Sequence, residues 1–173
     1  MKTKLAAKAF AAVALACTAL AGCTKPGTAA TVNGRPVSEQ SVDELAQQLK
    51  ENGLDKSLTA SGVDLSSRFR LLEFRVTITA VGPAIDKASE KLDASQKDQI
   101  LQQCKKGLNA SSDLPSDVQR YCLARALTSG QPAFQKEISG ILADMKVEYS
   151  KRYGVADKQK GLELPEYLTL RRR

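Results

Sequence analysis

The chain has 173 residues, with 26 Lys and Arg, 19 Asp and Glu and no His, and its formal net charge is +7. The absence of histidine excludes Ser-His-Asp and Cys-His catalysis, and it leaves few ligands for zinc. Basic residues alternate with acidic ones, whereas a nucleic-acid binder would cluster them on one face with aromatics between them. Composition therefore argues against these catalytic classes, a metal site and nucleic-acid binding.

The N-terminal segment has the three parts of an export signal, which are a basic start, an apolar run and small residues at the end. Lys2, Lys4 and Lys8 supply the charge, and residues 10–20 form the apolar run. This run is too short to cross a bilayer, because a helical span needs roughly 20 apolar residues. The segment is therefore predicted to be a signal peptide rather than a transmembrane helix.

The end of this segment, Leu20-Ala21-Gly22-Cys23, resembles the lipobox of bacterial lipoproteins. The resemblance implies that residues 1–22 are removed and that Cys23 carries a diacyl lipid. Two acyl chains give stable anchoring, so the protein is predicted to lie at the extracytoplasmic face of a bacterial cell membrane. The alternative is an ordinary secretory signal that is cut elsewhere, with Cys23 incidental.

Removal of residues 1–22 leaves 151 residues, which is one domain's worth of chain. The three leader lysines take the formal charge from +7 to +4, and Arg171, Arg172 and Arg173 supply three of the remaining charges. This C-terminal tail, residues 158–173, is predicted either to contact anionic lipid or wall polymer or to be solvated. Residues 23–29 are predicted to be a flexible linker.

The cysteine count predicts one disulfide. Cys17 leaves with the signal peptide and Cys23 carries the lipid, so Cys104 and Cys122 remain. Outside the cytoplasm an even pair of cysteines favours a disulfide, and closing a loop of this length would stabilise the fold by roughly 3 kcal/mol in the chain-entropy model. Two buried free thiols are the alternative.

The mature chain is predicted to begin with a strand and a capped helix. Residues 30–32 suit a strand that ends in a turn at Asn33-Gly34, since both turn residues tolerate positive φ. The hydroxyl of Ser38 can then cap a helix with an acidic first turn. Apolar residues at three- and four-residue spacing predict that this helix covers residues 39–51.

Four further helices are predicted from apolar periodicity, caps and breakers. The segment of residues 65–92 is the most apolar, and its two apolar stripes imply burial on two sides. Gly82-Pro83 should kink or split it, because proline lacks the amide hydrogen and clashes with the preceding turn. The other three are predicted over residues 93–106 after a capping box of Asp93 and Gln96, from about residue 113, and from Pro132. Residues 53–64 are predicted to be a loop.

Residues 147–149 alternate apolar and polar side chains, which predicts a short strand that pairs with residues 30–32. Residues 161–173 have alternating leucines around Pro165 and are predicted to be an edge strand or a loose tail. In the helix of residues 93–106, Ile100, Leu101 and Cys104 are predicted to face inward. Both remaining cysteines thus fall on apolar faces of neighbouring helices, as a disulfide between helices requires. The predicted fold class is mainly α, with about five helices and a small two-stranded β element that joins the ends of the domain.

Two segments carry a family resemblance. Residues 30–38, Ala-Thr-Val-Asn-Gly-Arg-Pro-Val-Ser, precede an acidic amphipathic helix, and residues 146–154 contain the triplet Arg152-Tyr153-Gly154. Together they resemble the N-terminal chaperone module of SurA-type proteins, over residues 30–157. The resemblance implies a holdase-like role without ATP, in which an apolar groove between helices binds unfolded or translocating polypeptide. No room remains after Tyr153 for the parvulin-type prolyl isomerase domain of full SurA and PrsA proteins, so no isomerase activity is expected.

Phe69, Phe74 and Phe134 are predicted to line such a groove if they are exposed, and otherwise to belong to the core. A second hypothesis is a structural or adaptor lipoprotein that binds one specific folded partner. An enzyme is the third, but the sequence offers no nucleophile with a base and no Gly-rich phosphate loop. It would require a cluster of perturbed carboxylates in a deep pocket. We therefore predict no enzyme activity and no cofactor.

Overall fold

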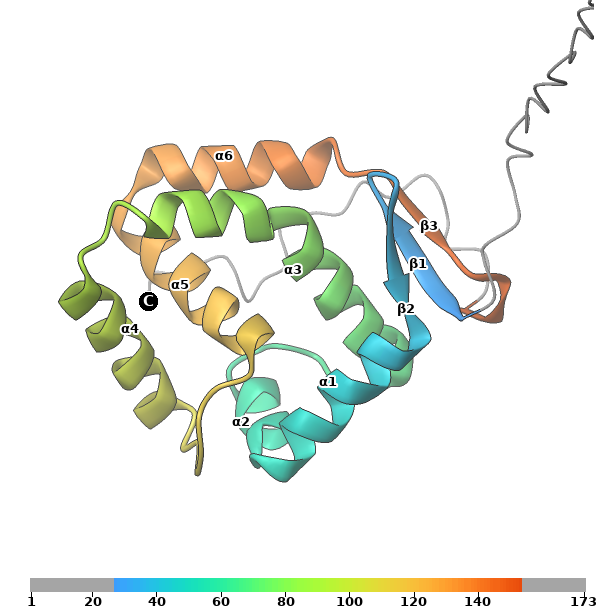
Figure 1. Cartoon of the computed structure of the whole chain (residues 1–173), viewed down its shortest axis with the longest axis horizontal. Helices are drawn as coiled ribbons and strands as arrows, with labels where there is room; N and C mark the ends of the chain where they lie inside the picture. The colour runs from blue at the N-terminus through green and yellow to red at the C-terminus, as the bar shows by residue number, and fades with distance from the viewer. Residues whose placement is uncertain (1–26, 154–173) are drawn as a thin grey trace, which may run out of the picture.

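A small antiparallel sheet joins the two ends of the domain (Figure 1). The computed structural model describes residues 27–153, and their strands lie in the order β2-β1-β3. The strands are β1 (Thr28–Val32), β2 (Arg35–Ser38) and β3 (Val147–Tyr149). The predicted pairing of the first and last strands is confirmed, since Ala30 lies opposite Tyr149 and Val32 opposite Val147.

The strand β2 corrects the prediction of a two-stranded element. Asn33 and Gly34 have φ of +50° and +80°, so they form the expected tight turn, and the chain folds back beside β1 at once. Pro36 has no amide hydrogen, but β2 is an edge strand, where proline is tolerated. The sheet also begins earlier than expected, because β1 contains the last two residues of the predicted linker.

The first helix, α1 (Glu39–Glu51), has the predicted bounds and cap, and the hydroxyl of Ser38 accepts a hydrogen bond from the amide of Ser41 at 3.0 Å. The segment after it was predicted to be a loop, and this was wrong for α2 (Leu54–Ala60). Leu54 and Leu58 of this helix are fully buried. Seven residues are too few to establish a helical period in the sequence, so packing of these two leucines decides the structure.

The most apolar segment forms α3 (Arg68–Ser89), which is buried on two sides as predicted. It continues through Gly82 and Pro83 without a break, and Figure 1 shows that it changes direction along its length. Of the two alternatives predicted for Gly82-Pro83, the helix therefore bends and does not split.

Three helices complete the domain, which has six α-helices within residues 27–153, one more than predicted. They are α4 (Ala94–Gly107), α5 (Ser116–Gly130) and α6 (Pro132–Ala143), and a short 3₁₀ turn, η1 (Lys151–Tyr153), follows β3. The capping box at Asp93 and Gln96 is confirmed, with hydrogen bonds of 2.7 and 3.1 Å. The predicted class, mainly α with a small β element, is confirmed.

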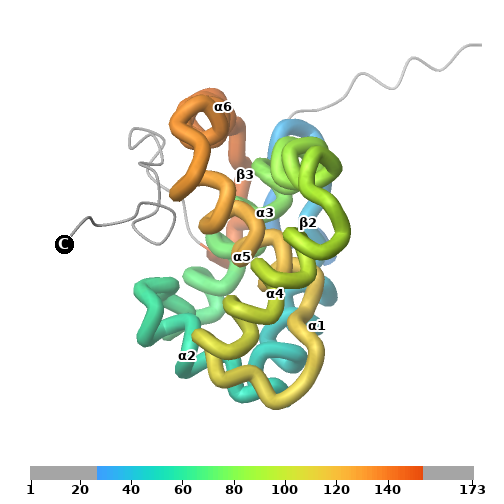
Figure 2. The backbone as a smooth tube through the Cα atoms, turned by 90° about the vertical axis from the view of Figure 1, so that its left-hand side faces the viewer, coloured from blue at the N-terminus to red at the C-terminus, as the bar shows by residue number. Residues whose placement is uncertain are grey.

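The core is one continuous cluster centred on α3 and α5. Its two largest fully buried side chains are Phe74 and Tyr121, whose rings meet edge to face with centroids 6.2 Å apart. α4 differs from the other five helices of the described chain, because none of its residues is fully buried. Figure 2 shows α4 beside α5, and Figure 1 shows α4 on the side of the molecule away from the sheet. In residues 27–153, no helix combines the length and the apolarity needed to cross a membrane.

Candidate functional site

A disulfide attaches α4 to α5. It joins Cys104 and Cys122, whose Cα atoms are 5.9 Å apart, so the predicted pairing is confirmed. The two apolar residues that precede Cys104 in α4, Ile100 and Leu101, were expected to point inward, and both are only half-buried. Because α4 packs mainly against α5, this bond is a principal attachment of the helix to the domain.

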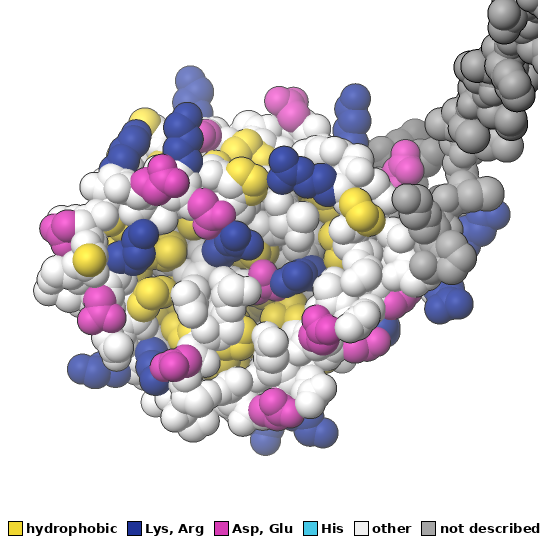
Figure 3. All heavy atoms as spheres, in the orientation of Figure 1, with side chains coloured by type: hydrophobic (Ala, Val, Ile, Leu, Met, Phe, Trp, Pro, Cys, Tyr) yellow, Lys and Arg dark blue, Asp and Glu magenta, His cyan; other side chains and the backbone are white. Residues whose placement is uncertain are grey.

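A cleft of about 460 Å³ lies between α4, α5 and the end of α2, next to the disulfide. Its apolar lining consists of Ile100, Leu108, Ala126 and the two cysteines. We call this space the α4–α5 cleft. On the face of the molecule drawn in Figure 3, hydrophobic side chains lie in small groups among charged ones.

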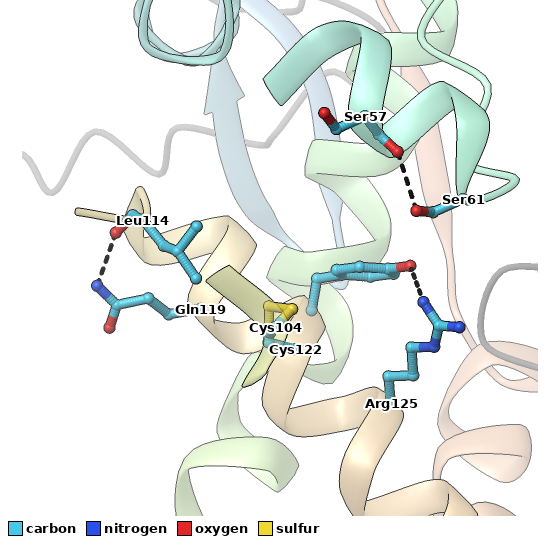
Figure 4. Close-up of a disulfide and its surroundings, with 8 residues drawn as sticks. Ser57, Ser61, Cys104, Leu114, Gln119, Cys122 and Arg125 are labelled. Carbon is cyan, nitrogen blue, oxygen red and sulfur yellow. Dashed lines mark hydrogen bonds between the residues drawn. A yellow bond between two sulfur atoms is a disulfide. The ribbon is translucent and has the colours of Figure 1, made fainter. Parts of the chain in front are cut away.

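Polar groups surround the apolar lining of the α4–α5 cleft. Gln103, Ser61, Arg125 and Ser129 line it. Figure 4 shows Arg125 beside the disulfide, and its guanidinium donates a 3.4 Å hydrogen bond to the hydroxyl of Tyr121. The hydroxyl of Ser61 donates to the carbonyl of Ser57 at 2.9 Å, on the α2 side. The cleft therefore combines apolar surface with donors and acceptors that a peptide backbone can use.

The three phenylalanines predicted for a groove do not lie together. Phe74 and Phe134 are 1% and 4% exposed, so the exposure that the prediction required is absent and both belong to the core. Phe69 is half-buried, and its ring packs against Tyr149 at 5.3 Å and Tyr153 at 6.3 Å between centroids. Periodicity identified the apolar faces, but it does not tell a core face from a groove face.

Near Phe69, a polar cluster connects the start of α1, the start of α3 and η1. Arg68 donates to Glu39 at 2.8 Å, to the hydroxyl of Tyr153 at 2.9 Å, and to Asp43. The same Tyr153 hydroxyl donates to Glu39 at 2.6 Å. Tyr153 belongs to the Arg-Tyr-Gly triplet of the family resemblance, and here it holds the returning chain against α1.

The cluster shifts the pKa of its acidic groups. Partial burial acts to raise the pKa of Glu39, but hydrogen bonds from Tyr153 and Arg68 and the nearby positive charges outweigh it, so the pKa is lowered. The hydrogen bond from Arg68 lowers the pKa of Asp43. Burial and the hydrogen bond to Glu39 raise the pKa of Tyr153. Glu39 and Asp43 therefore stay charged, and Tyr153 stays neutral, across the physiological pH range, as a fixed structural contact requires.

Glu39→Gln is expected to lower the free energy of unfolding by about 1 to 2 kcal/mol at pH 7, because it removes a charged hydrogen-bond acceptor. A carboxyl with a lowered pKa stabilises the fold above its unfolded-state pKa, and this contribution disappears as the pH falls through the folded-state value. The difference from the parent should therefore shrink below about pH 4.5. Urea unfolding at pH 7 and pH 3.5 measures it. Glu44→Gln on the exposed side of α1 is the control, and a Glu39→Gln difference independent of pH would contradict the assignment.

A second cleft, of about 550 Å³, lies between β2, α3 and α5. Two ion pairs cross it in opposite directions: Arg75 of α3 binds Asp117 of α5, and Arg120 of α5 binds Asp86 of α3 with contacts of 3.1 and 2.8 Å. Asp117 is 3% exposed, so its charge needs the guanidinium partner. In each pair the arginine and the aspartate neutralise each other's charge, and the two pairs hold α3 against α5. The sequence carries no sign of them, because the partners lie far apart along the chain.

Within the described ranges, no group of three or more Cys, Asp or Glu residues is placed to hold a metal ion. Cys23, Arg171, Arg172 and Arg173 lie outside the described residues, as do the signal peptide and residues 154–157 of the predicted domain. Comparison with protein-family models, curated proteins and solved structures finds no match to this chain. The resemblance to SurA-type modules therefore stays a prediction that depends on the motifs quoted above.

Proposed function

We propose that the chain is a lipid-anchored extracytoplasmic protein with a chaperone-like role, which binds short unfolded or translocating polypeptide segments in the α4–α5 cleft without ATP. The observation that supports this best is the mixed lining of the cleft. Apolar side chains of an extended segment would cover Ile100 and Ala126, which are both half-buried, and its backbone would pair with the polar groups around them. Binding sites in proteins are typically clefts of a few hundred Å³ with this mixture of groups.

The attachment of α4 favours the same use of the cleft. None of its residues is fully buried, so its apolar face retains surface that a ligand can cover. Covering apolar surface contributes roughly 25 cal/mol per Å². The disulfide to α5 keeps the wall of the cleft in place while this surface stays uncovered. A peptide would therefore meet a prepared site and would not have to order the helix first.

The predicted lipid also suits the position of the cleft. Only three residues separate Cys23 from Gly27, so their Cα atoms are at most about 15 Å apart. Gly27 lies at the sheet, where its carbonyl accepts a 2.7 Å hydrogen bond from the amide of Glu39. α4 lies at the opposite end of the domain (Figure 1). A lipid on Cys23 would hold the sheet near the membrane and leave the α4–α5 cleft open to polypeptides on the aqueous side.

The adaptor hypothesis is the second candidate, and the burial of Phe74 and Phe134 favours it. Without these rings, the apolar surface offered to a client is small. A cleft of about 460 Å³ holds only a few side chains, which suits one short sequence displayed by a folded partner. The two hypotheses differ in whether an unrelated unfolded protein is bound.

Ile100→Ser is expected to weaken suppression of client aggregation about tenfold, since loss of a half-buried isoleucine contact removes about 1.4 kcal/mol. The assay follows light scattering of an unfolded client with increasing amounts of the mature chain, carrying Cys23→Ser and no nucleotide. Leu101→Ser is the matched control, because Leu101 is also half-buried on α4 but does not line the cleft. Thermal unfolding of both variants corrects for stability. If Ile100→Ser and Leu101→Ser lose the same amount of suppression, the cleft is not the client-binding site. If the parent protein does not suppress aggregation at all, the chaperone-like role is rejected and the adaptor hypothesis remains.

The lipid anchor is tested separately. Cys23→Ala removes the acceptor thiol and so abolishes acylation. The variant is expected either to lose its signal peptide and appear in the soluble fraction or to keep its signal peptide uncleaved. Mass spectrometry of the N-terminal peptide of the parent should show a diacylated Cys23. Recovery of Cys23→Ala protein, cleaved and still bound to the membrane, would reject the anchor.

A further inference from the structure

The charge of the α4–α5 cleft is positive and comes from a single side chain of its described lining. Among the described residues that line it, Arg125 is the only charged one. Arg125 is exposed, and its one hydrogen bond described above is long, at 3.4 Å. The guanidinium has five N–H donors, so most of them are available to a ligand. The chemistry of the cleft therefore suits an extended segment with apolar side chains and at least one carboxylate.

The C-terminal part of this chain has that composition. Residues 162–170 read Leu-Glu-Leu-Pro-Glu-Tyr-Leu-Thr-Leu, with two glutamates and no basic residue. In an extended segment, alternate side chains point to the same side, so the four leucines and Glu166 would share one face and Glu163 would lie on the other.

We propose that residues 162–170 dock in the α4–α5 cleft of their own chain, with leucines on Ile100 and Ala126 and a glutamate on Arg125. This inference rests on the proposed function, and it deepens it in two ways. The tail would act as a built-in competitor that clients must displace. Its sequence also identifies the preferred clients as extended segments that are rich in leucine and contain one or two acidic residues.

The length of the chain allows this docking. Tyr153 is the last described residue, in η1 at the sheet end of the domain. Nine residues further on, Leu162 can lie about 30 Å away, and Leu170 about 56 Å away, at roughly 3.3 Å per residue. A domain of residues 27–153 is about 36 Å across. The segment can therefore reach the far end of the domain, where α4 lies, from about Leu164 onward.

The tether makes even weak docking effective. The linker would have to be nearly extended to reach the cleft, so the effective concentration lies below the mM value of a relaxed short linker. At an effective concentration of about 0.1 mM, a contact with a Kd of about 0.01 mM would be occupied about nine-tenths of the time. Clients would then bind about tenfold more weakly than to a chain with a free cleft. The second cleft is a poorer site for the same segment, because two of its three arginines are already paired with Asp86 and Asp117 and most of its lining residues are polar.

The test places a photo-reactive p-benzoylphenylalanine at position 103 of the full-length chain in bacterial cells. Gln103 is exposed and lines the cleft, whereas its neighbour Gln102 is exposed and does not, so position 102 is the matched control. Illumination should join position 103 to residues 162–170 within a monomer, as peptide mapping would show, and position 102 should give little product. No link from position 103 to residues 162–170, equal yields at both positions, or links only between two chains would overturn the proposal.

A second measurement separates this proposal from the proposed function. Leu162→Ser/Leu164→Ser/Leu168→Ser should strengthen client binding about tenfold and abolish the cross-link. The cross-link needs no client, so its formation without any client binding would support the docked tail and reject the chaperone-like role. If client binding depends on Ile100 but no cross-link forms, or if client binding is unchanged in the triple variant, docking of residues 162–170 is rejected and the proposed function stands.

Discussion

Loss of the disulfide, by Cys104→Ser/Cys122→Ser or by reduction, is expected to lower the free energy of unfolding by about 3 kcal/mol. The bond closes a loop between residues 18 apart in sequence, and the chain-entropy model gives this value for such a loop. The loss should be felt most in α4, because burial contributes little to holding that helix. For a domain of this size the expected fall in Tm is on the order of 10 °C.

Calorimetry of the parent with and without reductant measures the loss, and hydrogen exchange locates it. We expect faster exchange in Ala94–Gly107, with α3 and α5 amides changed only by the global loss of stability. The double serine variant should match the reduced parent, which controls for the change of side chain. An unchanged Tm, or exchange that rises equally in all helices, would contradict the view that the bond is a main attachment of α4. Loss of the disulfide should also reduce the suppression of client aggregation, since the α4–α5 cleft then loses one wall.

Phe74→Ala is expected to cost about 3 to 5 kcal/mol, as large-to-small changes of buried aromatic residues do. Phe74 is 1% exposed, and its ring meets Tyr121 edge to face at the centre of the core. A domain of this kind has a total stability of about 5 to 15 kcal/mol, so the variant should unfold at much lower urea. The urea midpoint, with the slope held in common, measures the change.

Phe69→Ala is the matched comparison, since Phe69 lies in the same helix and also contacts aromatic rings. Phe69 is only half-buried, so less apolar surface is lost and a smaller cost, of about 1 to 2 kcal/mol, is expected. Equal costs for the two variants would show that Phe74 is less central than its burial indicates. A folded Phe74→Ala protein that loses client binding at unchanged stability would instead restore the groove role predicted from the sequence.

Local signals determined much of this fold without any tertiary information. Asn33-Gly34 specifies a tight turn because both residues accept positive φ, and Ser38 and Asp93 mark helix starts because their side chains satisfy free amides. The pairing of residues 30–32 with 147–149 followed from two short strand patterns at opposite ends of the chain. Cys104 and Cys122 followed from counting, since the predicted signal peptide and lipid use the other two cysteines. Each of these signals acts within a few residues or through covalent chemistry.

Other features were decided only by tertiary structure. α2 forms because Leu54 and Leu58 find a buried place, although seven residues have little helical stability alone. Phe74 and Phe134 became core while Phe69 stayed half-buried, because burial depends on which elements cover a face. The reciprocal pairs Arg75–Asp117 and Arg120–Asp86 join charges that are distant in sequence.

The α4–α5 cleft shows the same division. Periodicity predicted that Ile100 and Cys104 face inward, and the sequence by itself determined the apolar face of α4 and its disulfide. Gln103, Ala126 and Ser129 had no signal, because a cleft consists of surface left uncovered when helices meet. How much surface stays uncovered depends on the crossing of α4 and α5 and on the end of α2. A sequence states what each helix offers, and only packing in three dimensions decides what remains open to a ligand.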